Sequence, residues 1–235
     1  MKIDNFVKQL EEIGIPLSDH QLRQLEQYYE LLIEYNKVMN LTGITEKEAV
    51  YLKHFYDSAT LNQIINLQDQ QSLCDIGTGA GFPGLVLKIL FPHLQVTLVD
   101  SLNKRIQFLN IVIHKLGLEK IDTYHARAEE FAHHHREEYD VVTARAVANL
   151  TTLLEYCVPL VKVGKYFIPM KANINDELII AEGAMKKLAV TIVREINFEL
   201  PIEQSHRCLL MFCKQVKTDR RYPRKFSEMK KKPLN

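Results

Sequence analysis

A glycine-rich stretch, DIGTGAGFPG over residues 75–84, is the most informative part of the sequence. It follows a short apolar run at 73–76 and precedes an apolar segment that ends at Pro92, as expected for a buried strand, a turn and a helix. Glycine readily adopts positive φ angles and lets a ligand approach the backbone closely. Because ligands bind at the carboxyl ends of the strands in open α/β sheets, the stretch predicts a ligand-binding loop.

Apolar, strand-like runs alternate with helical segments on both sides of this loop. Helices are expected near residues 104–116, 150–160 and 176–188. This alternation predicts an α/β, Rossmann-like fold with a mainly parallel, seven-stranded sheet and helices on both faces. The last two strands are expected to form an antiparallel hairpin. The predicted strands are 73–76, 95–99, 121–125, 140–144, 165–170, 193–200 and 208–214.

Charge is distributed unevenly along the chain. Residues 1–72 carry a net charge of −5 and residues 73–213 a net charge of −1, whereas residues 214–235 carry +7. Together with the change in periodicity, this predicts three parts. They are an N-terminal helical cap (1–71), a cofactor-binding core (72–214) and a basic C-terminal tail (215–235).

The first part is predicted to be helical, because its apolar residues recur at helical spacing. Ser18 is expected to cap its second helix, and Thr45 with Glu48 fits a capping box for the third. His54 and Asp57 are three residues apart and share a helical face. We expect these two side chains either to form hydrogen bonds within the domain or to lie near the substrate.

Composition excludes several classes of protein. The chain has 235 residues, 46% of them hydrophobic, which excludes a disordered chain. It has no apolar run of the ~20 residues that a membrane span needs, and residues 1–15 lack a signal pattern. A cytoplasmic protein with no membrane partner is therefore expected. The four cysteines and the consecutive histidines 133–135 lack the spacing of metal ligands, so no metal is expected.

Two cofactors compete for the glycine-rich loop. Residues 79–84 match GxGxxG, the dinucleotide fingerprint, and Asp100 after the next strand could bind a ribose hydroxyl of either cofactor. The carboxylate of Asp75 would repel a pyrophosphate but attract the ammonium and sulfonium groups of S-adenosylmethionine. The spacing therefore favours an S-adenosylmethionine-dependent methyltransferase, with a nicotinamide-dependent oxidoreductase as the alternative.

Motifs along the whole chain carry a family resemblance. They are Asn40-Leu-Thr-Gly43, His54 with Asp57-Ser58, the loop 75–84, Asp100-Ser-Leu-Asn-Lys-Arg105, Ala144-Arg-Ala146, Tyr222-Pro-Arg-Lys225 and Lys232-Pro-Leu234. Together they resemble the bacterial ribosomal RNA small subunit methyltransferase G family, also called glucose-inhibited division protein B. Members of this family often read AGTP after YPRK, whereas this chain has Phe226-Ser-Glu-Met229.

The resemblance implies a function and a site. The implied function is transfer of a methyl group from S-adenosylmethionine to N7 of one guanine in 16S ribosomal RNA. The resemblance places Gly77 and Phe82 against the cofactor, Asp100 on its ribose and Ala128-Glu129 beside its adenine. It also places Arg145 at the methyl-transfer pocket. The complete predicted cofactor site is Asp75, Gly77, Gly79, Phe82, Asp100, Ala128, Glu129 and Arg145.

Arg145 and Asn40 are the candidate catalytic residues, both with a positioning role. Guanine N7 has an in-plane lone pair and no proton, so its methylation needs no general base, and catalysis would rest on orientation and electrostatics. Arg145 is expected to position the base or the RNA backbone, and Asn40 is a second candidate for the pocket. The alternatives are a surface ion pair for Arg145 and a bond to the local backbone for Asn40.

The C-terminal tail interleaves basic and aromatic residues, which suits contact with RNA phosphates and unstacked bases. The predicted partner is 16S ribosomal RNA or the small ribosomal subunit, bound by a monomer. A solvated tail and a noncatalytic RNA-binding protein with a vestigial cofactor fold are the alternatives. The predicted RNA-binding residues are Lys104, Arg105, Arg220, Arg221, Arg224 and Lys225.

Overall fold

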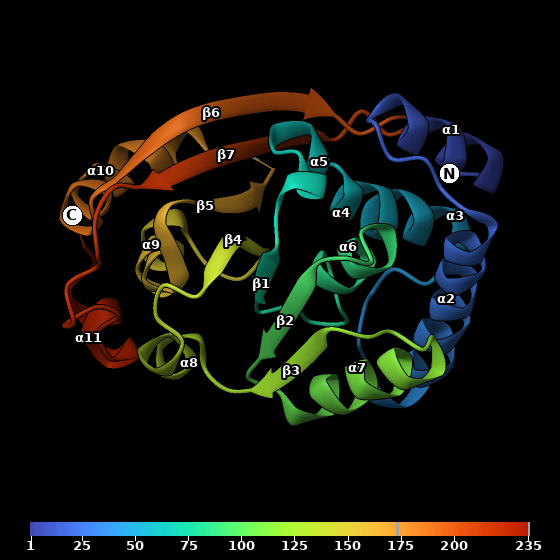
Figure 1. Cartoon of the computed structure of the whole chain (residues 1–235), viewed down its shortest axis with the longest axis horizontal. Coiled ribbons are helices and arrows are strands. Elements are labelled where there is room, and N and C mark those ends of the chain that lie inside the picture. Colours follow the sequence, from blue (N-terminus) through green and yellow to red (C-terminus); the bar gives the residue numbers. More distant parts are fainter. Residues whose placement is uncertain (173, 235) are drawn as a thin grey trace.

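The computed structural model describes residues 1–172 and 174–234. Its strands are β1 (Ser72–Ile76), β2 (Gln95–Asp100), β3 (Ile121–His125), β4 (Tyr139–Arg145), β5 (Val161–Lys171), β6 (Val190–Glu199) and β7 (His206–Lys214). They form one sheet in the order β3-β2-β1-β4-β5-β7-β6 (Figure 1). Strands β1 to β5 pair in parallel, and β7 is antiparallel to β5 and β6. This arrangement confirms the predicted α/β fold and its terminal hairpin.

Helices cover both faces of the sheet. They are α1 (Ile3–Glu12), α2 (Asp19–Met39), α3 (Lys47–Val50), the π-helix η1 (Tyr51–Tyr56), α4 (Asp57–Ala59), α5 (Leu61–Ile64), α6 (Gly84–Leu90), α7 (Asn103–Lys115), α8 (Ala128–His134), α9 (Leu150–Cys157), α10 (Asn175–Leu188) and α11 (Phe226–Lys231), with short 3-10 turns η2 (Leu67–Asp69) and η3 (Val158–Leu160). Figure 1 shows α2, α6 and α7 on one side and α8, α9 and α10 on the other. None of the helices described is long and apolar enough to cross a membrane.

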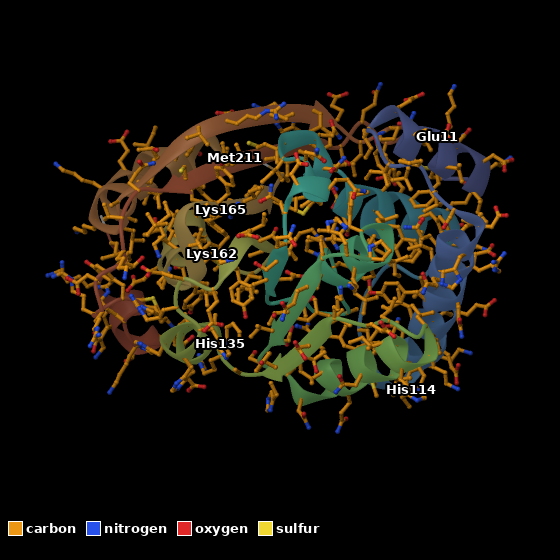
Figure 2. All side chains as sticks on the ribbon, in the orientation of Figure 1. Glu11, His114, His135, Lys162, Lys165 and Met211 are labelled. Carbon is orange, nitrogen blue, oxygen red and sulfur yellow. The ribbon has the colours of Figure 1, made fainter. Side chains whose placement is uncertain are left out.

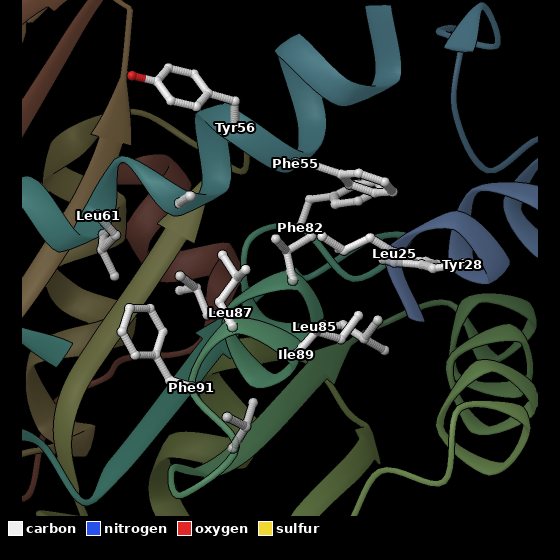
Figure 3. Packing of buried hydrophobic residues seen from close by; sticks show 14 of the residues in the cluster. Leu25, Tyr28, Phe55, Tyr56, Leu61, Phe82, Leu85, Leu87, Ile89 and Phe91 are labelled. Carbon is white, nitrogen blue, oxygen red and sulfur yellow. The ribbon is translucent and has the colours of Figure 1, made fainter. Parts of the chain in front are cut away.

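The N-terminal helices share a hydrophobic core with the sheet. Tyr28 on α2 stacks on Phe55 and Phe82 at centroid distances of 5.4 and 5.6 Å (Figure 3). Its hydroxyl donates to the carbonyl of Ala80 in the glycine-rich loop. Gly81 has φ +105°, and a Cβ there would lie 2.6 Å from the Tyr28 hydroxyl, so only glycine fits. The division at residue 72 stays a prediction, and this buried cluster extends across it.

Helix capping in the N-terminal part agrees with the prediction at one helix and differs at the next. Ser18 caps α2 in a reciprocal capping box, as expected. The capping box assigned to Thr45 and Glu48 is wrong. Helix α3 begins one residue later, because the carboxylate of Glu46 accepts a hydrogen bond from the Ala49 amide at 3.0 Å and so serves as the N-cap.

Candidate active site

The glycine-rich loop is held from below by a buried carboxylate. Gly77 and Gly79 have φ angles of +71° and +64°, which glycine adopts without strain. One oxygen of Asp75, Oδ2, accepts hydrogen bonds from the Thr78 hydroxyl at 2.7 Å and the Gly84 amide at 2.8 Å. The other, Oδ1, has no partner among the described residues although the side chain is fully buried. Burial raises the pKa of Asp75 to about 6, against the effect of both hydrogen bonds.

Asp100, at the end of β2, holds the same loop from the side. Its Oδ2 accepts from the Gly79 amide at 2.9 Å, and its Oδ1 accepts from the Leu102 amide at 2.9 Å. The guanidinium of Arg105 pairs with it, with Nη1 3.1 Å from Oδ2. Arg105, predicted to contact RNA, therefore has a partner inside the protein, and Asp100 is fixed at the carboxyl edge of the sheet.

A cavity of about 530 Å³ opens at this edge, within the size range of small-ligand pockets. Carboxylates of Asp100 and Glu129 lie on its lining together with apolar residues such as Val99 and Val147. These acceptors and apolar side chains suit a nucleoside, whose hydroxyl and amino groups donate to carboxylates and whose flat base packs against apolar side chains. The predicted residues on the lining are Gly77, Asp100, Ala128 and Glu129; those outside it are Asp75, Gly79, Phe82 and Arg145.

A second group of side chains gathers around Arg145 at the carboxyl end of β4. Its Nη1 donates to Asp57 Oδ2 at 2.7 Å and to the Lys53 carbonyl at 3.2 Å. Asp57 also accepts from Nε of Arg207 on β7, at 2.7 Å. The ion pair considered for Arg145 is therefore present, but it is buried, because the Asp57 and Arg145 side chains are 5% and 15% exposed. One carboxylate thus holds two arginines at this edge.

His54 and Phe82 complete this group. His54 in the π-helix η1 and Asp57 at the start of α4 both contact Arg145, which agrees with the expectation of hydrogen bonds within the domain. His54 Nδ1 lies 3.4 Å from Arg145 Nη2, and its Nε2 lies 2.9 Å from the Thr42 hydroxyl. Burial, with the positive charge of Arg145, lowers the pKa of His54 to about 3. The imidazole is therefore neutral at physiological pH; since arginine only donates, Nδ1 accepts and Nε2–H donates to Thr42.

The Phe82 ring joins His54 and Arg145. The rings of Phe82 and His54 stack at 4.3 Å with an interplanar angle of 12°, and the Arg145 guanidinium lies 5.4 Å from the Phe82 centroid. Sequence reasoning missed Thr42 and Arg207 as members of the group. Thr42 lies in the Asn40–Gly43 motif and was within reach of the pattern, whereas no pattern marks Arg207.

Asn40 lies next to this group rather than within its described contacts. It is the exposed C-cap of α2, with φ +49°, and its amide bonds to the Asn36 carbonyl. That bond is made by the backbone N–H of Asn40, and its left-handed conformation is one that asparagine adopts at helix ends. Lys104 Nζ donates to the neighbouring Met39 carbonyl at 2.7 Å, which places Lys104 beside the end of α2.

The predicted RNA-binding residues of the tail differ in exposure. Arg220, Arg221 and Lys225 are exposed. Arg224 instead forms a bidentate pair with the buried Glu155 of α9, with Nε–Oε1 2.8 Å and Nη2–Oε2 2.7 Å. The tail is therefore folded against α9, and Arg224 anchors it there.

Within the described ranges, no group of three or more histidine, cysteine, aspartate or glutamate side chains is placed to hold a metal ion. His135, labelled in Figure 2, stacks on Phe131 at 4.1 Å, and its Nδ1 lies 2.9 Å from a carboxylate oxygen of Glu138. All four cysteines are free, and Cys213 is only partly buried.

The fold and the site together define a class of protein. The chain resembles the crystal structure of precorrin-6y C5,15-methyltransferase from Geobacter metallireducens, with a TM-score of 0.51 and 15% identity over 73% of this chain and 90% of that one. It also resembles M. jannaschii TYW2 in complex with AdoMet, with a TM-score of 0.52 and 11% identity over 63% and 71%. The class is the S-adenosylmethionine-dependent methyltransferase fold.

Sequence similarity identifies the family. Residues 21–201 match the family described as rRNA small subunit methyltransferase G. The chain is 48% identical to the Ribosomal RNA small subunit methyltransferase G of Exiguobacterium sibiricum, over the full length of both, and 50% identical to that of Bacillus licheniformis, over 100% and 99%. The chain belongs to this family. The methyltransferase prediction is thereby confirmed, and the oxidoreductase alternative is not supported.

Proposed function

We propose that the protein transfers a methyl group from S-adenosylmethionine to N7 of a guanine in 16S ribosomal RNA. The observation that carries the proposal is the nucleoside-sized cavity beside the glycine-rich loop, in a chain of this family. The relatives named above are small-subunit ribosomal RNA methyltransferases over the whole length of the chain, which supports the same substrate class here.

Four residues of the cavity would hold the cofactor. Asp100 would accept from the ribose hydroxyls, Ala128 and Glu129 would flank the adenine, and the Gly77 backbone would allow close approach. Asp75 lies behind the loop, where its fully buried carboxylate, with Oδ1 unpartnered among the described residues, provides negative charge toward a cationic cofactor. The cofactor itself supplies an electrophilic methyl group on a positively charged sulfur.

Arg145 would orient the guanine or its phosphate without taking part in proton transfer. Guanine O6 is an acceptor next to N7, and arginine is a common donor to it. The guanidinium is already fixed by Asp57 and the Lys53 carbonyl, so little of its freedom is lost when RNA binds. The neutral His54 and the Phe82 ring stacked on it restrict Arg145 from the other side.

RNA would approach along the basic edge formed by the exposed residues of the tail and Lys104. We propose Arg220, Arg221, Lys225 and Lys104 as phosphate contacts, since all four are exposed and exposed cations suit phosphates. Arg105 and Arg224 would not contact RNA directly. Arg105 would hold Asp100, and Arg224 would hold the tail against Glu155. Binding as a monomer in the cytoplasm, and the division into residues 1–71, 72–214 and 215–235, remain predictions.

Mass mapping of 16S RNA from cells with and without the protein tests the reaction. The N7-methylguanosine should disappear without the protein, and its persistence would contradict the proposal. Labelled methyl incorporation into 16S RNA by the purified protein separates an enzyme from a noncatalytic RNA binder. Arg145→Ala should lower turnover by about 100-fold, as removal of a preorganised donor does, whereas Arg23→Ala, an exposed arginine on α2, should leave it unchanged.

A further inference from the structure

The C-terminal tail contributes a wall to the cavity that holds Asp100 and Glu129. We infer that helix α11 is part of the cofactor site, with Phe226 and Met229 packing against the nucleoside of S-adenosylmethionine. This inference rests on the proposed function. It assigns to the tail a role in cofactor binding, in addition to the RNA contacts expected from its charge.

One face of α11 and the residues after it line the cavity. The four lining residues of this segment are Phe226, Met229, Lys230 and Pro233. Phe226, Met229 and Lys230 are three and four residues apart, which is the spacing of one helical face, and Pro233 follows the end of the helix. Ser227 and Lys231, on the other positions of the helix, are exposed and are not part of the lining. The helix therefore presents one face to the cavity and another to solvent.

The position of α11 is fixed by contacts at its start. Arg224 bonds to both carboxylate oxygens of Glu155, which is 1% exposed, and its backbone amide adds a third bond at 2.9 Å. Arg136 donates to the carbonyls of Thr218 and Tyr222 at 2.7 and 2.6 Å. Figure 1 shows α11 beside α8 as a result. Charge-assisted bonds of this kind are among the strong ones in proteins.

The end of α11 is held by apolar burial. Tyr222 before the helix and Leu234 after it are each 4% exposed, and Met229 within it is 5% exposed. All three belong to the hydrophobic cluster on the α8, α9 and α10 side of the sheet. The tail is thus packed as part of the fold.

Phe226 reaches the part of the cavity that carries the carboxylates. The guanidinium of Arg127 lies 5.2 Å from the Phe226 ring centroid, and Arg127 Nε donates to Glu129 at 2.9 Å. Phe226 lines the cavity and is 44% exposed as a residue. Aromatic rings stack on nucleobases, and a methionine thioether packs well against aromatic faces. A purine between Phe226 and the opposite apolar wall would cover this ring.

The absence of tryptophan from the chain allows a direct test. Phe226→Trp introduces a single indole on the cavity face, and Lys231→Trp introduces one on the solvent face. Titration with S-adenosylhomocysteine should change the emission of the first variant in a saturable way and leave that of the second unchanged. Equal behaviour of the two variants would overturn the inference.

Calorimetry with S-adenosylhomocysteine gives the energetic test. Phe226→Ala should weaken binding about tenfold, as loss of an aromatic stacking partner does, while Ser227→Ala should match the wild type. Binding of 16S RNA by Phe226→Ala should not change. Equal cofactor affinity in Phe226→Ala and wild type would overturn this inference alone, whereas a wild-type protein that does not bind S-adenosylhomocysteine would refute the proposed function as well.

Discussion

Replacing Asp75 by asparagine should change how stability depends on pH. Burial raises the pKa of this carboxyl from its ordinary 3.8 to about 6 in the folded protein. Between these values the folded protein keeps a proton that the unfolded chain has released. The free energy of unfolding therefore falls as pH rises through this window. A shift of this size corresponds to about 3 kcal/mol.

Asp75→Asn removes this titration but keeps an oxygen that can accept from Thr78 and Gly84. The free energy of unfolding of the variant, relative to wild type, should therefore increase by about 3 kcal/mol between pH 4 and pH 7.5. Urea denaturation followed by circular dichroism at each pH measures it. A difference that stays constant over this range would show that the buried carboxyl titrates normally and would refute the reasoning.

Asp140 offers a control with the opposite sign. It lies at the other end of the sheet, where Lys162 Nζ is 3.0 Å and Lys165 Nζ is 3.8 Å from Oδ1 (Figure 2). Burial opposes ionisation of Asp140, but the bonds from Lys162 and the Gln71 amide outweigh it and lower its pKa. The folded protein thus gains stability from this carboxylate as pH rises through the interval between the lowered pKa and the ordinary value of 3.8. The stability of Asp140→Asn relative to wild type should therefore fall as pH rises through that interval, which lies below the window for Asp75.

Two further substitutions test packing and anchoring. Gly84→Ala would place a Cβ too close to Leu98 Cδ2 and 2.8 Å from Asp75 Cβ. The substitution should lower the free energy of unfolding by about 1–3 kcal/mol, seen as a lower melting temperature. An unchanged melting temperature would contradict this packing. Arg224→Ala would leave the buried carboxylate of Glu155 unpaired. It should lower the free energy of unfolding, measured by urea denaturation, by about 3–5 kcal/mol. A decrease below about 1 kcal/mol, typical of a surface pair, would show that the tail is not anchored there.

Local patterns predicted most of the fold and part of the site. Strands buried on both faces leave continuous apolar runs, and the glycine-rich loop follows one of them, so both were readable from the sequence. Asp100 was found for the same reason, because it ends the next strand. Gly77, Asp100, Ala128 and Glu129 were expected to share a site, and the structure brings them to one cavity.

The remaining features depend on long-range contacts that no local pattern encodes. Asp57 and Arg207 are 150 residues apart and meet only because β7 inserts beside β5. Arg105 was expected to face RNA, but its side chain turns back to Asp100 at the end of β2. The positive charge of the tail could be counted from the sequence. The cavity under α11, in contrast, depends on the ion pair between Arg224 and Glu155, which are far apart in the chain.

The shared carboxylate of Asp57 has a consequence for protein engineering. In a chimera that joins residues 1–71 of one relative to the remainder of another, Asp57 would come from one parent protein and its partners Arg145 and Arg207 from the other. It would also separate Tyr28 from Gly81, which meet at the glycine-rich loop. Recombination at residue 72 should therefore succeed only between parents that match at these five positions, so the two segments should be exchanged as a matched pair.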